Sequence, residues 1–348
     1  MQQTPEPAPR TPREQPAPAR LDAAAGVLLG AACGDALGVP YEFGPRLAAD
    51  RRPEMVGGGL GPYRPGEYSD DTQMAACIAR ALAAAGGGAV REGGDSGVLA
   101  EEILDAIAEN FLTWRFEGAS DIGNQTRAVL DAAAASRGTP GVAGVMLAAA
   151  RERYGAGVPS AGNGSLMRTG AVGLCFLDDP LRTAEAARLV GDLTHADPLA
   201  GDACVLWCEG IRGAVSGGGF DGVRGGLDLL PAERRDWWAD RLNEAEQAPP
   251  HTFNPNGFVV PALQAAWSAV ATTGGEGEGH LVTSLENAVR AGDDTDTVAA
   301  IAGALLGARW GASSVPAPWR QAVHGWPDLA ADDLEELGRS VAAADFGG

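Results

Sequence analysis

Two acidic segments far apart in the chain each open an apolar helical pattern, and this pairing constrains the fold more than any other sequence feature. The first segment is YSDDTQMA at residues 68–75, and the second is AGDDTDTVAA at residues 291–300. Apolar side chains recur at helical spacing from Met74 after the first segment and from Val298 after the second. Both segments are therefore predicted to lie on the first turns of buried helices.

Carboxylates at such helix starts are suited to bind a hard divalent cation. The unpaired backbone N–H groups and the positive dipole end keep Asp ionised, as a ligand of such a cation must be. An alternative interpretation is that the acidic residues only cap their helices, because Ser and Asp are favoured there. Capping uses one or two oxygens per helix, whereas DDTDT offers three carboxylates and two hydroxyls within five residues. This surplus favours a metal site, provided that the two helix starts meet.

The size and charge of the chain limit its class. Its 348 residues, 45% of them apolar, are enough for one large or two ordinary domains and permit an enzyme. The formal net charge is −20, and every basic residue is arginine. Tight binding to nucleic acid or to an anionic membrane is disfavoured, because such partners need a basic surface. A nucleotide bound locally is compatible with this charge.

The first residues and the cysteines indicate a cytoplasmic protein. Residues 1–20 contain six prolines and no apolar signal-peptide core, so they are expected to form a disordered arm. The five cysteines lack metal-binding or disulfide spacing and are expected to be buried thiols. No uninterrupted stretch is expected to act as a transmembrane helix.

Beyond the arm, residues 21–348 are predicted to form one all-α domain. Alternating β-branched runs are few, and no shift in composition divides the core. Helices rich in Ala, Gly and Leu can approach closely, as a compact multi-helix globule requires. Helix starts are predicted near Leu21, Asp70, Gly97, Asn124, Pro140 after the cap Thr139, Leu166, Thr183, Pro198 after the cap Asp197, Glu233, Gly257, His280, Asp296 and Asp332.

Four short motifs in order resemble the ADP-ribosylglycohydrolase family, which includes dinitrogenase-reductase-activating and ADP-ribosyl-acceptor hydrolases. The motifs are GDALGVPYEFGP at residues 34–45, SDDTQM at 69–74, GNGSLMR at 162–168 and GDDTDTVAAIAGALLGA at 292–308. Similar segments are DIGNQTRAVL at 121–130, THADPLAGDA at 194–203 and NGFVVPALQAA at 256–266. Each motif alone is weak, but the ordered set is highly specific and spans nearly the whole chain after residue 20.

The resemblance implies an all-helical fold with a di-metal centre, usually Mg²⁺ or Mn²⁺, at the bottom of a central ADP-ribose cleft. The positions that match the family's metal ligands are Ser69, Asp70, Asp71, Asp294, Asp296 and Thr297. Asp293 stands where many members carry Gly and is not expected to be a ligand. With Glu42 the site has five carboxylates, so two divalent ions would leave it nearly neutral. Such ions can hold ribose hydroxyls and orient a water.

Glu42 and Asp121 are the expected catalytic carboxylates. The resemblance matches Glu42 to a mobile acidic residue near the metals and the scissile bond, so Glu42 is predicted to act as general base. The alternative is that Glu42 only balances charge or caps a turn. Asp121 matches an acidic residue at the substrate end of the cleft in bacterial members, where it would orient a guanidinium. Its alternative role is to cap the helix that follows.

The GNGSLMR segment is the expected phosphate site. Its small residues precede an apolar helical stretch, so backbone N–H groups can approach a diphosphate, although the same string is typical of an ordinary helix start. Many relatives carry an aromatic residue where Ala161 stands, so adenine stacking is expected either to come from elsewhere, with Phe258 as the candidate, or to be weaker. The contacts to pyrophosphate and ribose implied by the resemblance come from Ser160, Gly162, Asn163, Gly164 and Ser165.

Three further residues are expected to line the cleft. Gly123 and Asn124 would approach the distal ribose through their backbone. His195 matches a position near the phosphates or the adenosine ribose, and a structural role is its alternative.

The resemblance implies a metal-dependent hydrolase that removes ADP-ribose from modified macromolecules, with the N-glycosidic bond to arginine as the favoured linkage. The same metals could serve O-linked ADP-ribose on serine or acetyl groups, or ADP-ribose on nucleic-acid bases, which the net charge of −20 disfavours. A different class is a catalytically silent ADP-ribose binder. The presence of all six ligand positions and Glu42 argues against that class. The expected partners are an ADP-ribosylated protein and the product ADP-ribose, with no membrane.

Overall fold

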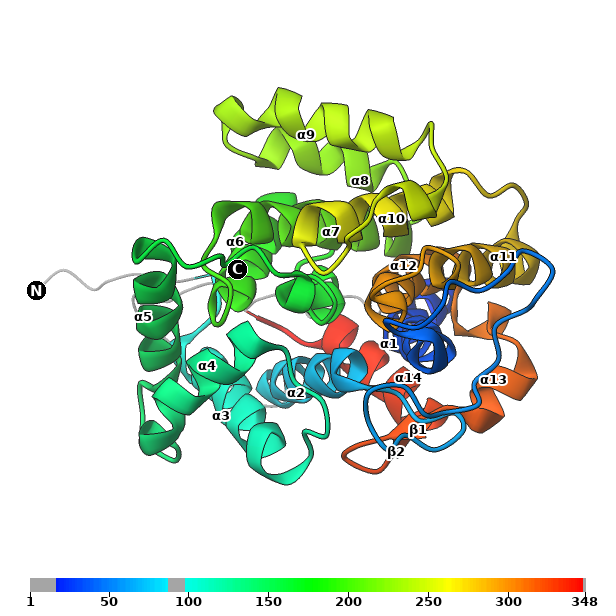
Figure 1. The fold of residues 1–348 in the computed structure, drawn as a ribbon. Helices are drawn as coiled ribbons and strands as arrows, with labels where there is room; N and C mark the ends of the chain where they lie inside the picture. Colours follow the sequence, from blue (N-terminus) through cyan, green and yellow to red (C-terminus); the bar gives the residue numbers. More distant parts are fainter. Residues whose placement is uncertain (1–16, 87–97, 347–348) are drawn as a thin grey trace, which may run out of the picture.

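The computed structural model describes residues 17–86 and 98–346, and these are mostly helical, as expected (Figure 1). A two-residue antiparallel hairpin is formed by β1 (His324–Gly325) and β2 (Leu329–Ala330). The α-helices are α1 (Pro18–Gly38), α2 (Asp70–Ala85), α3 (Glu101–Glu117), α4 (Asn124–Ala133), α5 (Val142–Gly155), α6 (Pro180–Asp192), α7 (Pro198–Val215), α8 (Gly222–Gly225), α9 (Ala232–Ala245), α10 (Val259–Ala271), α11 (Gly277–Val289), α12 (Thr295–Trp310), α13 (Ala317–Ala322) and α14 (Ala331–Ala343).

Helices α1 and α12 lie side by side and antiparallel in the middle of the molecule, where Figure 1 shows them in blue and orange. Small residues face each other along their contact at intervals of four. The facing pairs are Gly26 with Gly307, Gly30 with Gly303 and Gly34 with Ala299. A Cβ added to Gly26, Gly30 or Gly34 would overlap the backbone carbonyl opposite it. The contact therefore depends on backbone-to-backbone approach.

This contact fixes the register between the carboxyl end of α1 and the amino end of α12. A Cβ on Gly38, the last residue of α1, would overlap the backbone of Asp296 in the first turn of α12. Helix α2 packs against both α1 and α12, and α14 covers another face of α1. The two acidic segments at the starts of α2 and α12 are thereby placed beside one end of α1.

The central helix α1 has a property that the sequence reading did not anticipate. Together with the 3₁₀ turn η1 (Val39–Tyr41) it is long and apolar enough, by length and composition, to cross a membrane. Its apolar window is nearly all buried by the surrounding helices, so it is also what the core helix of a globular protein looks like. All five cysteines are buried and free, as predicted.

Most of the predicted helix starts lie close to the observed ones, and those at Asp70, Asn124 and Pro198 are confirmed to the residue. Helix α1 begins at Pro18, inside the segment expected to be a disordered arm. Residues 1–16 of that arm and the start expected near Gly97 lie outside the described residues; α3 begins at Glu101.

Two local predictions are wrong. Leu166 does not open an α-helix, because residues 163–174 form the 3₁₀ turns η3 (Asn163–Ser165) and η4 (Thr169–Leu174) in a glycine-rich stretch with low helix propensity. Thr139 does not cap α5. Instead Asp105 of α3 accepts hydrogen bonds from the N–H groups of Gly141 at 2.6 Å and Ala143 at 2.9 Å. The cap thus comes from another helix, which local sequence does not reveal.

We predict that Gly30→Ala lowers the free energy of unfolding by about 1–3 kcal/mol, as overpacking does elsewhere, because its methyl group must push α1 from α12. The matched control is Gly144→Ala in α5, where a Cβ meets nothing within 4 Å. There the same change should stabilise by about 0.5–1 kcal/mol. Denaturant unfolding measures both, and a Gly30→Ala protein as stable as the wild type would disprove the role of this contact.

Candidate metal centre and ligand cleft

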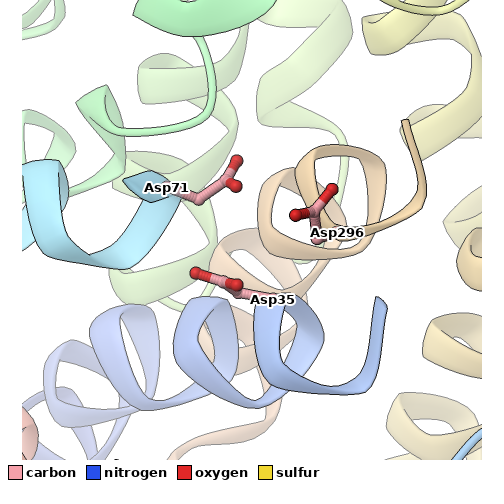
Figure 2. Close-up of side chains that lie close together, drawn as sticks. All are labelled: Asp35, Asp71 and Asp296. Carbon is pink, nitrogen blue, oxygen red and sulfur yellow. The ribbon is translucent and has the colours of Figure 1, made fainter. Parts of the chain in front are cut away.

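Three helices direct buried carboxylates toward one point. Asp35 comes from α1, Asp71 from α2 and Asp296 from α12, and Figure 2 shows the three side chains facing a common space. One oxygen of each lies within 4.8 Å of the others. A second group with the same spacing contains Glu42, Asp294 and Asp296. The two acidic segments of the sequence do meet, and Asp296 belongs to both groups.

The acidic segments are not explained by helix capping. Ser69 and Asp294 occupy the N-cap positions of α2 and α12, yet neither side chain makes a capping hydrogen bond. By contrast, Asp179 and Asp197 do cap α6 and α7 through their carboxylates, the latter as predicted. The carboxylates of the two segments are thus left for another purpose.

The oxygens of this cluster suit a cation because they outnumber the hydrogens available to bond to them. The Ser69 hydroxyl lies 2.8 Å from Asp35 Oδ1, 3.0 Å from Asp71 Oδ2 and 3.3 Å from Asp296 Oδ2, but it has one hydrogen to give. The other oxygen of Asp71 is buried and accepts no hydrogen bond from any described residue. Buried oxygens left in this state cost free energy unless a positive charge accompanies them.

The raised pKa values of the clustered carboxyl groups also favour a bound cation. Burial, followed by the neighbouring carboxylates, raises the pKa of Asp71 and of Asp296 well above the ordinary value. Burial and the charges of Asp294, Asp121 and Asp70 raise the pKa of Glu42 to about 9. Such groups are either protonated or neutralised by bound cations. Carboxylate and hydroxyl oxygens are the donors that hard divalent cations prefer.

The other expected ligands lie around this cluster. Asp70 is half-buried at the first position of α2, and burial, with Asp121 as the next cause, raises its pKa. Thr297 is buried in the first turn of α12. Asp293 has a left-handed backbone with φ of 54° and belongs to neither carboxylate group.

Asp35 is the residue that the sequence analysis missed, although it lies in the quoted GDALG motif. Its Oδ1 accepts from the N–H and hydroxyl of Ser69, both at 2.8 Å. Its Oδ2 accepts from the N–H of Thr72 at 3.0 Å and from the hydroxyl of Thr72 at 2.6 Å. Asp35 therefore caps α2 from outside and holds the first turn that contains Asp70 and Asp71.

Glu42 lies in a loop that is tied to the second acidic segment. It follows the turn η1, and the next residue, Phe43, has a left-handed φ of 47°. The N–H of Phe43 donates to the carbonyl of Asp293 at 2.7 Å. The loop thus reaches the start of α12, while the carboxylate of Glu42 stays half-buried beside Asp294 and Asp296.

The turn at residues 162–165, here called the GNG turn, pairs with the segment that starts α10. Gly162 and Phe258 form an antiparallel bridge, and the flanking hydrogen bonds run from Val259 N–H to Ala161 at 2.9 Å and from Asn163 N–H to Gly257 at 3.2 Å. This pattern leaves the N–H of Gly162 outside the bridge bonds. Phe258 is 51% exposed beside the turn, as a stacking surface requires.

Several predicted ligand contacts of the GNG turn have other partners. The side-chain amide of Asn163 donates to Asp294 Oδ2 at 2.8 Å, and its backbone N–H donates to the carbonyl of Gly257. Asn163 therefore supports the acidic cluster instead of presenting donors to a diphosphate. The Ser160 hydroxyl donates to the carbonyl of Val158 at 2.7 Å, and Ser165 is fully buried. The side chains of both serines are therefore buried instead of facing a ligand at the surface of the turn.

His195 and the start of α4 lie beside the GNG turn. A Cβ on Gly162 or Gly164 would lie 3.3 or 3.2 Å from His195 Nε2, so the imidazole lies against the GNG turn. Asp121 is half-buried just before α4, and its carboxylate accepts from the N–H of Ile122 at 2.7 Å. Gly123 and Asn124 are exposed at the start of α4.

Comparisons with known proteins find one family over nearly the whole chain. The sequence profile of the ADP-ribosylglycohydrolase family matches residues 16–346. The chain is 27% identical over 307 residues to the ADP-ribosyl-dinitrogen reductase glycohydrolase of Rhodospirillum rubrum, covering 87% of this chain and 90% of that protein. It is 29% identical over 315 residues to the ADP-ribosylarginine hydrolase Tri1 of Pseudomonas putida, covering 87% and 74%. A solved structure titled ADP-ribosylglycohydrolase-related protein complex is similar with a TM-score of 0.67 and 26% identity, covering 93% of this chain and 98% of that one.

We predict that Asp35→Asn weakens the binding of Mg²⁺ or Mn²⁺ about tenfold or more, as loss of a residue that orients metal ligands does elsewhere. The amide NH₂ group of the asparagine would face the backbone N–H of Ser69 or of Thr72, so one of these hydrogen bonds at the start of α2 would be lost. Calorimetric titration of the metal-free protein measures the affinity.

The matched control is Asp105→Asn, because Asp105 also caps a neighbouring helix with both oxygens but supports α5. Both variants should lose about 1–3 kcal/mol of unfolding free energy, yet the control should bind cations as the wild type does. Equal cation affinity in the two variants would rule out the positioning role of Asp35.

Proposed function

Because the chain belongs to the ADP-ribosylglycohydrolase family, we propose that it is a hydrolase that removes ADP-ribose from modified proteins by cleaving the N-glycosidic bond to arginine. The observation that supports this most is the meeting of two acidic helix starts beside the GNG turn, with Asn163 bonded to Asp294 between them. Relatives named as ADP-ribosylarginine hydrolases and as an ADP-ribosyl-dinitrogen reductase glycohydrolase support the arginine linkage.

In this proposal the acidic cluster holds two divalent cations, Mg²⁺ or Mn²⁺. The residues that would hold them are Ser69, Asp70, Asp71, Asp294, Asp296 and Thr297, with Glu42 in the resting state. When bound, the cations would supply positive charge for binding ribose hydroxyls and for lowering the pKa of a water. Asp35 and Asn163 act behind these residues, since each hydrogen-bonds to one of the two acidic segments.

Glu42 is proposed as the general base. It takes a proton from the attacking water as the water oxygen bonds to C1″ of the ribose. The C1″–N bond breaks, its electron pair leaves with the guanidine nitrogen, and that nitrogen takes up the proton that Glu42 removed. Asp121, whose charge helps raise the pKa of Glu42 through their proximity, would hold the guanidinium. The loop with Gly44 and Pro45 would let Glu42 move aside for substrate.

The diphosphate is proposed to lie at the GNG turn. The N–H of Gly162 and the imidazole of His195 would contact it, and Phe258 would stack on adenine. Gly123 and Asn124, exposed at the start of α4, would approach the distal ribose. Each end of ADP-ribose is thus held by a different part of the chain.

We further propose one working domain from Pro18 onward and a cytoplasmic location, where the five buried cysteines would stay reduced. The partner would be an ADP-ribosylated protein. The net charge of −20 disfavours a nucleic-acid substrate.

The function is tested by incubating arginine-linked and serine-linked ADP-ribosyl peptides with the protein and Mg²⁺ or Mn²⁺ and measuring release of ADP-ribose by mass spectrometry. We expect release from arginine, its loss with excess chelator, and loss of most bound metal and activity in Asp296→Asn. The matched control is Asp293→Asn, because Asp293 is in the same segment but outside both carboxylate groups, and it should stay active. Full activity in excess chelator would refute the metal proposal, and release from serine alone would refute the linkage.

We predict that Glu42→Gln lowers kcat about 100-fold or more while ADP-ribose affinity stays within a few-fold, because one proton-transfer group is lost. Glu54→Gln, an exposed residue that follows in the same connection before α2, should leave kcat unchanged. Steady-state kinetics at saturating substrate and product titration measure the two effects. Near-normal turnover of Glu42→Gln would exclude the base role without affecting the metal assignment.

A further inference from the structure

Arg168, the last residue of the GNGSLMR motif, is a fully buried cation to which the mechanism above gives no task. No carboxylate of the described residues forms an ion pair with it. Its Nη2 donates to the hydroxyl of Thr194 at 2.7 Å, its Nη1 lies 3.7 Å from the sulfur of Met74, and its guanidinium stands 4.6 Å from the ring centre of Phe111. Burial of an arginine among neutral partners costs free energy, because its charge loses water without gaining an opposite charge.

The Thr194 hydroxyl links Arg168 to His195. Thr194 Oγ1 lies 2.7 Å from His195 Nδ1, and both side chains are buried. A guanidinium can only donate, so Thr194 accepts from Arg168. The single hydroxyl hydrogen then has Nδ1 as its only acceptor among the described residues. The hydroxyl hydrogen is therefore satisfied when Nδ1 is unprotonated.

The ring is also held neutral. Burial, followed by the positive charge of Arg168, lowers the pKa of His195 well below its usual value. A neutral imidazole with a free Nδ1 has its proton on Nε2. Nε2 is the atom that lies against Gly162 and Gly164, and it makes no hydrogen bond with any described residue. A donor thus faces the GNG turn.

We propose that Arg168 and Thr194 are positioning residues that fix His195 in its Nε2–H tautomer, so that the cleft offers a hydrogen-bond donor to a phosphate or ribose oxygen of the ligand. In the opposite tautomer a nitrogen lone pair would face the same oxygen and repel it. The identity of that ligand as ADP-ribose rests on the proposed function, but the tautomer does not.

Other groups hold the same region in place. Gln125 of α4 donates from Nε2 to the carbonyls of Ser160 and Thr194, each at 3.0 Å, which fixes Thr194 relative to the GNG turn. Met74 and Phe111 are on α2 and α3, so Arg168 connects these helices to Thr194. The relay Arg168–Thr194–His195 does not include any of the clustered carboxylates. Its loss should change ligand binding more than cation binding.

The tautomer is measured directly by two-bond ¹H–¹⁵N correlation spectra of the imidazoles. The chain has four histidines, and His195→Gln identifies the signal by its disappearance. We expect Nε2–H in the wild type at neutral pH. Thr194→Val removes the hydroxyl with little change of shape and should populate the Nδ1–H form, whereas Thr194→Ser keeps the hydroxyl and should restore Nε2–H. An Nδ1–H or imidazolium form in the wild type would overturn the proposal, as would an unchanged tautomer in Thr194→Val.

Calorimetric titration with ADP-ribose in the presence of Mg²⁺ provides the functional measurement. Thr194→Val should bind about tenfold more weakly, as expected for one lost hydrogen bond to a charged group, while Thr194→Ser binds within a few-fold of wild type and Mg²⁺ affinity is unchanged in both. Normal ADP-ribose affinity in a Thr194→Val protein with the altered tautomer would overturn the donor role. A wild type that shows Nε2–H but does not bind ADP-ribose would instead refute the proposed function.

Discussion

The close contact between α1 and α12 is the constraint on which the rest of this structure depends. Helices that meet through side chains stand 8–10 Å apart in general, but here glycines such as Gly30 and Gly303 remove the side chains from the contact. The antiparallel register then places Gly38 on the backbone of Asp296 and Asp35 beside the start of α2. Three helix termini converge because two helices touch along their length, and the chemistry of the site follows from that packing.

The convergence creates an excess of buried negative charge that the protein alone does not neutralise. The space between Asp35, Asp71 and Asp296 holds too few hydrogens: the single hydroxyl hydrogen of Ser69 faces an oxygen of each, and the other oxygen of Asp71 accepts no hydrogen bond from any described residue. Arg168 is buried nearby but faces Thr194 and Phe111 instead of pairing with a carboxylate. The cations proposed above would neutralise this charge, so their binding would stabilise the folded state.

Local patterns predicted what is locally determined. Apolar periodicity and first-turn residues predicted the helix starts at Asp70 and Pro198. The two acidic segments predicted that carboxylates would cluster where these segments meet. What failed were interactions whose partner lies elsewhere in the chain. Asp35 caps α2 and Asp105 caps α5 from neighbouring helices, and Asn163 turns its amide to Asp294. The four-residue spacing of glycines in α1 and α12 was visible in the sequence and is the signal that would have paired these helices.

The bond from Asn163 to Asp294 has a thermodynamic consequence. One side chain belongs to the turn proposed to hold the diphosphate and also hydrogen-bonds to Asp294, one of the carboxylates proposed to hold the cations. If occupancy of the turn alters this hydrogen bond, it changes the affinity of the cluster for cations, and linkage requires the cations to change affinity for the ligand by the same factor. The affinity for the product and the affinity for the cations would then be coupled through this amide–carboxylate hydrogen bond.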